Sequence, residues 1–249
     1  MTTILSLSAI SKTFDNGLEA IARMDLDVAQ GQFLSLVGPS GCGKSTALRI
    51  AAGLIQPTGG RVAWPQGRPQ VGFVFQDPTL MPWATVAANV RLPLDLMHVK
   101  GSEAEDRAAR AIARVGLAGF EKSFPRELSG GMKMRASIAR AIASHPKLLL
   151  MDEPFAALDE LTRQALNDDL LKLAREDAMT VMFVTHSVYE SSYLSSRVVV
   201  MTPRPGRIAA DLHLSPPPLR DASYRLTQEF ADAAGKVSAA LRSGMEKAA

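Results

Sequence analysis

Residues 38–46 read GPSGCGKST and come directly behind the apolar run FLSLV at 33–37. Gly38, four further residues and then Gly43-Lys44-Ser45 fit the pattern G-x-x-x-x-G-K-[ST]. Glycine has no Cβ, so the backbone N–H groups of such a loop can curl around phosphate oxygens without a steric clash. An apolar strand before the loop and a helix after it favour a phosphate-binding loop over a glycine-rich turn that binds nothing.

Several residues in this loop suit a nucleoside triphosphate. The helix that starts near Ser45 points the positive end of its dipole at the loop. Lys44 supplies positive charge to the terminal phosphates, and the Ser45 hydroxyl can ligate Mg²⁺. The same surroundings favour a reactive Cys42 thiol, whose alkylation is expected to block ATP binding. The loop therefore predicts a binding site for ATP and Mg²⁺ made of Gly38, Pro39, Ser40, Gly41, Cys42, Gly43, Lys44, Ser45 and Thr46.

Composition limits the class of protein. The 249 residues suffice for one large hydrophobic core, or for a core and a subdomain. The 28 Lys and Arg and the 25 Asp and Glu residues are scattered, which favours a solvated surface over a nucleic-acid partner. The single cysteine excludes an internal disulfide and fits a reducing compartment. Without a signal-peptide pattern or an apolar run near the roughly 20 residues that span a bilayer, we expect a cytosolic protein, which could still sit on a membrane through a partner.

Four short apolar runs without alternation predict buried parallel strands. These runs are Phe33–Val37, Val71–Phe75, Leu148–Met151 and Val181–Thr185. The stretches between them predict helices, among them Ser45–Ala52, Glu103–Val115, Gly131–Ala143 and Leu161–Arg175. The alternation indicates an α/β fold with a mostly parallel core sheet. Together with the phosphate-binding loop, it predicts a P-loop NTPase.

The parts outside this core have other patterns. ILSLSAISKTF and LEAIARMDLDV, near the N-terminus, predict an antiparallel β-subdomain with partly exposed strands. Residues 85–128 are mostly helical in pattern, so we expect a helical subdomain at about 82–132, inserted between the second and third core strands. We expect residues 1–214 to form one ATPase domain. The break SPPPLR then begins a C-terminal tail, 215–249, with an Ala-rich helix that is either packed on the body or loosely attached.

A carboxylate at the end of another core strand is needed to hold the metal ion. LLLMDEP supplies two carboxylates, Asp152 and Glu153, directly behind apolar residues. Asp152 would hold Mg²⁺ directly or through its water shell. Glu153, one residue further along, could polarise an attacking water. Such a pair after a strand is weak evidence by itself, and the phosphate-binding loop makes it a strong candidate.

Four further stretches resemble the ATP-binding subunits of ABC transporters. LSGGM (128–132) is similar to the signature motif, AALD (156–159) to the D-loop, VTHS (184–187) to the switch-histidine segment and FVFQDP (73–78) to the Q-loop. The resemblance implies a head-to-tail homodimer with two ATP molecules between the subunits. It also implies that a phosphate-binding loop of one subunit faces the signature of the other, an arrangement that closes on itself.

The resemblance gives individual residues a role. It implies that Ser129, Gly130 and Gly131 contact phosphate in the partner's site, although a flexible hinge is the alternative reading of SGG. His186 would contact the γ-phosphate, and Gln76 would sense Mg²⁺ or the attacking water. Phe14 lies where the family has an aromatic that stacks on adenine, although a phenylalanine beside a strand can also belong to the core. The expected catalytic residues are therefore Lys44, Gln76, Glu153 and His186. The residues expected to hold the metal ion are Ser45, Gln76 and Asp152.

The segment DPTLMPWATVAANV (77–90) resembles importer subunits for nitrate, sulfonates, taurine and related small compounds. VVVMTPRPGRI (198–208) and Met132 resemble the same branch, whereas Met134 and Ala136 depart from the usual signature helix. The resemblance implies that residues 77–97 face the transmembrane permease, and indirectly a substrate-binding protein, at the cytoplasmic face of the inner membrane. Trp83 would anchor that interface, unless it is packed inside the helical subdomain.

Two other functions remain as alternatives. One is a soluble ABC ATPase that acts on nucleic acid or ribosomes. Such proteins usually carry two nucleotide-binding domains or long inserted arms, and the chain has neither. The other is an exporter subunit, which the MPWATV segment disfavours.

Overall fold

The computed structural model describes residues 2–246 and divides into two compact units. Unit 1 contains the residues up to 69 and those from 180 onward, and unit 2 contains residues 70–179. The phosphate-binding loop and the switch histidine belong to unit 1. The carboxylate pair, the Q-loop and the signature belong to unit 2. Each unit is built around parallel strands whose carboxyl ends carry the candidate site residues.

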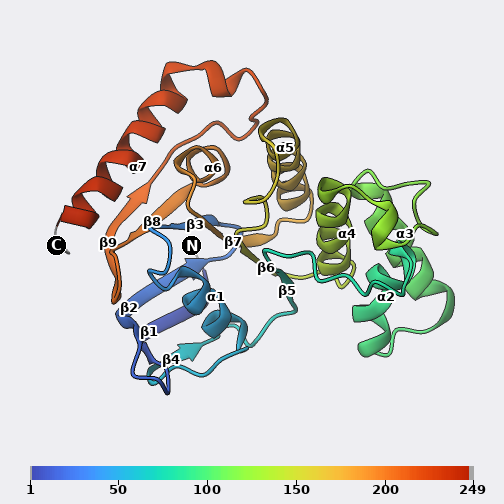
Figure 1. Cartoon of the computed structure of the whole chain (residues 1–249), viewed down its shortest axis with the longest axis horizontal. Coiled ribbons are helices and arrows are strands. Elements are labelled where there is room, and N and C mark those ends of the chain that lie inside the picture. Colours follow the sequence, from blue (N-terminus) through green and yellow to red (C-terminus); the bar gives the residue numbers. More distant parts are fainter. Residues whose placement is uncertain (1, 247–249) are drawn as a thin grey trace. The chain divides into compact units, whose positions relative to one another are not determined.

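The sheet of unit 1 combines parallel and antiparallel strands (Figure 1). In sheet order, the described strands are β4 (Gly59–Ala63), β1 (Thr3–Thr13), β2 (Glu19–Ala29), β9 (Gly206–His213), β8 (Arg197–Met201), β3 (Phe33–Val37) and β7 (Thr180–Thr185). β1 pairs antiparallel with both β2 and β4, whereas β3 lies parallel between β7 and β8. Every residue of β3 and β7 is buried, as expected of parallel strands that are covered on both faces.

The helices of unit 1 include α1 (Lys44–Ala52), α6 (Val188–Leu194) and α7 (Gln228–Glu246). The C-terminal helix α7 runs along β8 and β9 (Figure 1). Val237 of α7 is fully buried in a cluster with Val198 and Val200 of β8. The C-terminal helix is therefore packed on the body rather than loosely attached. The predicted tail also includes residues 247–249, which lie outside the described residues.

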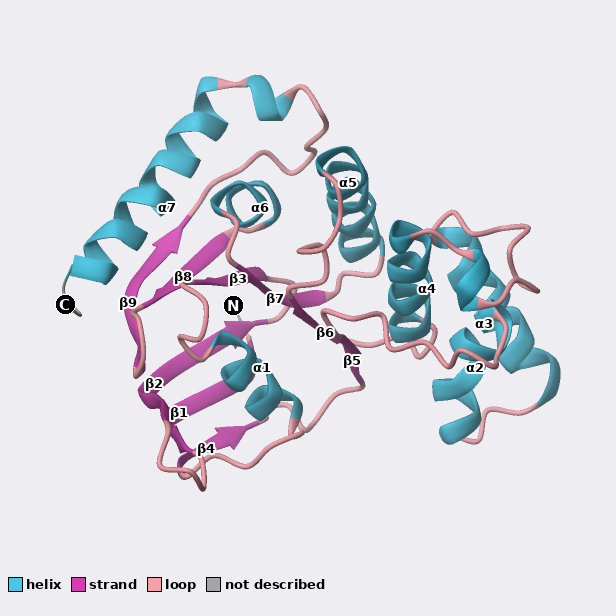
Figure 2. Ribbon diagram, viewed as in Figure 1, coloured by secondary structure: helices cyan, strands magenta, loops and turns pink. Residues whose placement is uncertain are grey.

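Unit 2 contains two parallel strands and a group of helices (Figure 2). The strands are β5 (Val71–Val74) and β6 (Leu148–Asp152), and the helices are α2 (Val86–Leu96), α3 (Gly101–Arg114), α4 (Gly130–Ile142) and α5 (Glu160–Glu176). α2, α3 and α4 contact one another, and α4 also contacts β5. Residues 85–128 are mostly helical, as the pattern predicts. The boundaries of the helical subdomain at 82–132 and of the ATPase domain at 1–214 stay predictions.

The α/β fold predicted from the sequence is confirmed, and the predicted strands and helices end within two residues of the observed ones. The antiparallel N-terminal strands are also present. Three strands, β4, β8 and β9, did not form part of the predicted set. β4 is short and contains two glycines, and β9 is mostly half-exposed without regular alternation, so these two sequences give only a weak strand signal. β8 is a buried apolar run, RVVVM, whose pattern is that of the predicted core strands.

An ion pair fastens β8 to β9 at the start of β8. Arg197 donates through Nε to Asp211 Oδ1 at 2.8 Å and through Nη2 to Oδ2 at 2.6 Å. The hydrogen bond from Arg197 lowers the pKa of the Asp211 carboxyl below its ordinary value. Because the pKa is lowered in the folded state, the pair stabilises the fold above the ordinary Asp pKa, about 3.9. This contribution is lost as the pH falls through the folded-state pKa.

We expect Asp211→Asn to lower Tm by about 2–4 °C at pH 7, which corresponds to about 1 kcal/mol for a partly exposed bidentate pair. The difference from the unmodified protein should shrink steadily below about pH 4, because both proteins then carry a neutral side chain there. Thermal unfolding followed by circular dichroism across pH 2–8 measures this difference. Asp95→Asn, which breaks the more exposed pair with Arg91, serves as a control and should shift Tm less. A Tm difference that does not change with pH would contradict the assigned role.

Candidate functional site

The phosphate-binding loop connects β3 to α1, as the sequence predicts. Gly43 precedes α1 with φ 97°, a left-handed conformation that glycine adopts at no steric cost, and no side chain caps the helix. A Cβ on Gly43 would lie 2.7 Å from the carbonyl oxygen of Ala20, and a Cβ on Gly206 would lie 2.1 Å from that of Cys42. The loop is thus packed backbone to backbone against β2 and β9. Such close packing holds the loop in one curled conformation that suits a phosphate group.

Lys44 is the first residue of α1 and is only 4% exposed. Its Nζ donates to the carbonyl oxygens of Gly38 at 2.9 Å and Pro39 at 3.0 Å. These two bonds hold the ammonium group against the loop that is expected to bind phosphate. A buried cation held this way is pre-positioned for an anionic ligand, because it does not have to be ordered when the ligand arrives.

Cys42 lies inside the phosphate-binding loop, between two glycines. Its side chain is fully buried, and its Sγ lies 4.0 Å from Lys44 Nζ. That alkylation of Cys42 blocks ATP binding stays a prediction, and the burial of the thiol implies that a reagent reaches it slowly in the folded chain. We expect N-ethylmaleimide to modify the native protein at least about tenfold more slowly than the urea-unfolded protein, since the loop must open first. Mass spectrometry over a time course measures both rates, and equal rates would contradict the burial.

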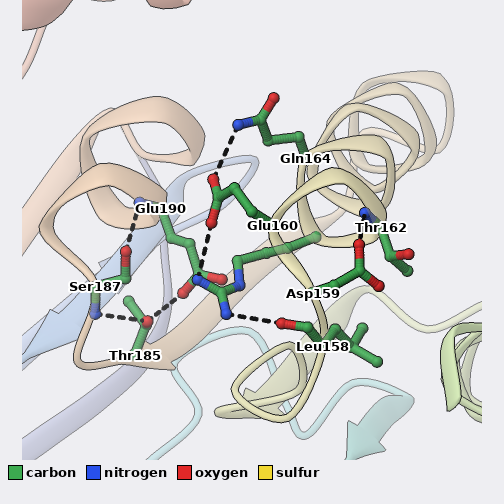
Figure 3. Close-up of polar contacts among 9 residues, drawn as sticks. Leu158, Asp159, Glu160, Thr162, Gln164, Thr185, Ser187 and Glu190 are labelled. Atoms are coloured by element: carbon green, nitrogen blue, oxygen red, sulfur yellow. Dashed lines mark hydrogen bonds and ion pairs between the residues drawn. The ribbon is translucent and has the colours of Figure 1, made fainter.

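His186 directly follows β7, the strand next to β3, which leads into the phosphate-binding loop. In the parallel pairing of β3 with β7, Val37 is opposite Thr185, so Gly38 and His186 leave neighbouring strands at the same edge. His186 itself is exposed. Its neighbours are fixed by a closed set of bonds: Ser187 N donates to Thr185 Oγ1 at 3.0 Å, Glu190 N donates to Ser187 Oγ at 3.2 Å, and Thr185 Oγ1 donates to the Glu190 carboxylate (Figure 3). The backbone on both sides of His186 is therefore held in place.

Phe14 lies between β1 and β2 and is 36% exposed. The alternative of a core phenylalanine is therefore wrong. The ring already carries a cation on one side, because Lys12 Nζ lies 5.4 Å from its centroid. An exposed ring of this kind can stack on a base. Its role with adenine stays a prediction.

In unit 2, the carboxylate pair and the Q-loop glutamine lie at one edge of the two-stranded sheet. Val74 of β5 is opposite Met151 of β6 in parallel strands. Gln76 and Asp152 come shortly after these two residues, so both lie at the carboxyl ends of neighbouring strands. Asp152 is the last residue of β6 rather than the first residue after it, and it is buried. Glu153 has φ 46°, a left-handed conformation that is strained for a residue with a Cβ. Strain of this kind is common where a side chain must point in a functionally required direction.

The signature residues open helix α4. Ser129 is the N-cap, and its Oγ accepts a hydrogen bond from Met132 N at 3.2 Å. Gly130 and Gly131 form the first turn, so the alternative of a flexible hinge is wrong. The Ser129 hydroxyl can still donate its proton to an anion, because it uses only an acceptor position in the cap. Helix N-termini with small residues and free backbone N–H groups are suited to phosphate.

The D-loop that follows β6 leads into α5. Asp159 accepts from Thr162 N at 3.0 Å, a bond that lowers the pKa of the Asp159 carboxyl (Figure 3). Arg163 donates to Leu158 O at 2.9 Å and lies 3.2 Å from a Glu160 carboxylate oxygen. The D-loop is therefore a capped turn with its own internal bonds. Reasoning from the sequence missed the buried Glu190 and the half-buried Arg140. Arg140 is a charge among apolar residues, whereas Glu190 lies among Tyr and Ser residues and has no such signal.

The residues fit a nucleotide that brings a metal ion with it. Among residues 2–246, no cluster of three or more His, Cys, Asp or Glu side chains could hold a metal by itself. The proposed metal set of a Ser hydroxyl, a Gln amide and one carboxylate suits Mg²⁺, which is usually bound by one or two carboxylates together with phosphates and water.

Every helix within residues 2–246 is too short or too polar to cross a bilayer.

Comparison with known proteins was made on sequence and on structure. Residues 21–156 match the family described as ABC transporter. An uncharacterised ABC transporter ATP-binding protein of Methanocaldococcus jannaschii is 48% identical over 213 residues, covering 82% of this chain and 79% of that protein. The aliphatic sulfonates import ATP-binding protein SsuB 1 of Pseudomonas syringae pv. syringae is 51% identical over 191 residues, covering 76% and 77%.

Solved structures resemble the fold as well. The ATP-binding cassette MJ0796, solved as a dimer in a post-hydrolysis state with ADP and Pi, superposes with a TM-score of 0.77 at 32% sequence identity. The match covers 85% of this chain and 99% of that one. CbiO1 of Clostridium perfringens, described as part of an ABC transporter complex, gives a TM-score of 0.77 at 25% identity.

Proposed function

Because this chain belongs to the ABC transporter family, and is an ATP-hydrolysing subunit of it, we propose that it powers an importer for a small compound of the nitrate, sulfonate or taurine type. The observation that carries the importer assignment is the 51% identity to an aliphatic sulfonates import ATP-binding protein. The substrate itself would contact other subunits. We therefore propose the substrate only as a chemical class.

We propose the following roles for this chain's residues at ATP. The curled loop and the N-terminus of α1 would bind the phosphates, with the Lys44 ammonium against the β- and γ-phosphates. Ser45, Gln76 and Asp152 would hold Mg²⁺, which when bound would neutralise phosphate charge. Glu153 would accept a proton from the attacking water, and His186 would contact the γ-phosphate. Phe14 would stack on the adenine.

We propose that two copies of the chain complete the site. Ser129, Gly130 and Gly131 at the start of α4 would contact the phosphates held by the partner's loop. MJ0796, a structural neighbour, was solved as a dimer with ADP and Pi, which supports this arrangement. The same surface of each copy would face the other, so the assembly closes as a pair.

We propose that the segment before α2 docks on the permease. Trp83 is 77% exposed, so the alternative of a packed tryptophan is wrong. The fully buried Asn89 shapes the segment: its Oδ1 accepts from Met81 N at 2.7 Å, and its Nδ2 donates to the carbonyls of Ala84 at 3.1 Å and Thr85 at 3.0 Å. A large aromatic on a rigid loop is a good interface anchor, because little entropy is lost on binding.

A groove in unit 2 supports the same proposal. It has a volume of about 450 Å³, and its apolar lining includes Phe73 of β5, Phe75 just after β5, and Leu92 and Leu96 of α2. Leu96 is highly exposed at its rim. A helix of the permease would fit a groove of this character. The chain would then lie on the cytoplasmic face of the inner membrane, attached through its partner.

Transport measured in cells tests the proposed function. A strain whose chromosomal copy carries Trp83→Asp should lose uptake of the labelled taurine-, sulfonate- or nitrate-type substrate, whereas the purified variant should keep its basal ATPase activity. The matched control is Trp64→Phe, a change in the chain's other tryptophan that should leave uptake intact. Unchanged uptake of all three compounds in the Trp83→Asp strain would overturn the importer assignment. Loss of export or of ribosome function instead would favour one of the alternatives.

A further inference from the structure

Arg140, near the C-terminal end of α4, binds the backbone that follows the Q-loop glutamine. Its Nη1 donates to Thr79 O at 2.8 Å, and its Nη2 donates to Pro78 O at 2.8 Å and to Thr79 Oγ1 at 2.9 Å. The two guanidinium nitrogens thus reach three oxygens of two consecutive residues. A fork of this shape fixes both the position and the direction of the peptide that it binds.

The acceptors are unusual for an arginine in this environment. All three are neutral oxygens, and partial burial lowers the pKa of Arg140 from its ordinary value. A half-buried cation normally gains most from a carboxylate partner. Here the charge is used to hold backbone instead, which suggests that the position of residues 78–79 is what matters.

Thr79 gives an independent sign that this segment is restrained. Its φ is 46°, in the left-handed region that a β-branched residue rarely adopts. Gln76 lies between this restrained residue and the end of β5 at Val74. The chain is therefore anchored before Gln76 by the sheet and after Gln76 by Arg140, so that a movement of Gln76 acts on both anchors.

The other end of α4 carries the signature. α4 is continuous from Gly130 to Ile142 with Ser129 as its N-cap, so Ser129 and Arg140 lie about 16 Å apart along one rigid helix. A displacement at Gln76 would pass through Arg140 to the helix and so to Ser129. Under the proposed function, Gln76 reads the ATP of its own subunit, and Ser129 contacts the ATP of the partner.

We propose that Arg140 is a positioning residue that couples the two ATP sites of the dimer, by tying the Q-loop segment to the signature helix. The inference rests on the proposed dimer. When Gln76 responds to its own nucleotide, Arg140 carries the response to the signature that serves the other nucleotide. Without Arg140, the Q-loop glutamine and the signature residues are still present, but the Q-loop segment is no longer tied to the signature helix.

The test is the ATP dependence of hydrolysis by the purified full-length chain. For the unmodified protein we expect a Hill coefficient between 1 and 2, the limit for two sites. Arg140→Ala should bring it to about 1 and lower kcat about tenfold, while the Kd of a fluorescent ATP analogue for the dilute monomer stays within about twofold. Arg140→Lys keeps the charge but loses the planar group that reaches several acceptors, so it should give an intermediate Hill coefficient. This variant serves as the test if Arg140→Ala does not fold.

Arg135 provides a matched control on the same helix. It donates to Val115 O at 2.8 Å and lies 2.6 Å from Asp169 Oδ2, so it is similarly engaged in the fold but does not bind the Q-loop segment. Arg135→Ala should lower Tm and keep the Hill coefficient. A cooperative unmodified protein whose Arg140 variants are equally cooperative overturns the inference. So does an unmodified protein that dimerises with ATP and has a Hill coefficient of 1, and in both cases the proposed function stands. Absence of any ATP-dependent dimer overturns the proposed function itself.

Discussion

Glu153→Gln is expected to lower kcat for ATP hydrolysis about 10²- to 10⁴-fold, the usual contribution of a positioned general base. The amide keeps the shape of the side chain but cannot accept a proton from water. Because Glu153 follows the strand-end Asp152 in a restrained left-handed conformation, the substitution should leave the backbone unchanged. ATP should therefore still bind with a Kd within about threefold of the original.

The measurement is phosphate release at saturating ATP and Mg²⁺, with nucleotide binding measured by isothermal titration calorimetry. Glu176→Gln is the control. Glu176 lies in the same unit at the end of α5, and it pairs with Arg114 of α3 instead of following the carboxylate strand. That control should keep its activity. Hydrolysis by Glu153→Gln at more than a tenth of the original rate would show that another group activates the water.

Lys44→Ala is expected to lower kcat/KM for ATP by about 10²- to 10³-fold, which corresponds to about 2.7–4 kcal/mol of lost electrostatic stabilisation. The ammonium is held at the loop by the carbonyls of Gly38 and Pro39, and residues 38–46 contain no second cationic residue that could replace it. Removing it also leaves those carbonyls with one partner fewer. Both nucleotide affinity and turnover should therefore fall.

Initial-rate kinetics over a range of ATP concentrations separate the two effects. The control is Arg61→Ala, an exposed cation on β4 of the same unit, which should change neither parameter by more than about twofold. Thermal unfolding of both variants shows whether the fold is retained. Full kcat/KM in a folded Lys44→Ala protein would contradict the role of the loop.

The α/β fold and the chemistry of the main motifs could be predicted because they depend on local patterns. Phe33–Val37 had to be a buried strand, since its residues are apolar without alternation, and it is fully buried as β3. The phosphate-binding loop depends on glycine at fixed spacing, and Gly43 indeed has a left-handed φ. The pairing of β3 with β7 places Gly38 and His186 at one sheet edge, and the sequence did not predict this pairing because it gives no strand order.

Other features depend on tertiary contacts that no local pattern contains. The burial of Cys42 follows from the packing of the loop against β9, a strand whose sequence gives a weak signal. The exposure of Trp83 depends on the loop that Asn89 organises from within the next helix. The bonds of Arg140 join residues about sixty positions apart in the sequence, so the sequence shows only an arginine in an otherwise apolar stretch.

The mass of the Glu153→Gln protein in solution tests most directly whether two copies enclose the nucleotides. Sedimentation velocity would be measured without nucleotide, with ATP and Mg²⁺, and with ADP and Mg²⁺. We predict a particle of twice the 26.7 kDa chain mass with ATP and Mg²⁺ and the single-chain mass in the other two conditions. A particle that stays at 26.7 kDa under saturating ATP and Mg²⁺, also when the permease is added, would contradict the account.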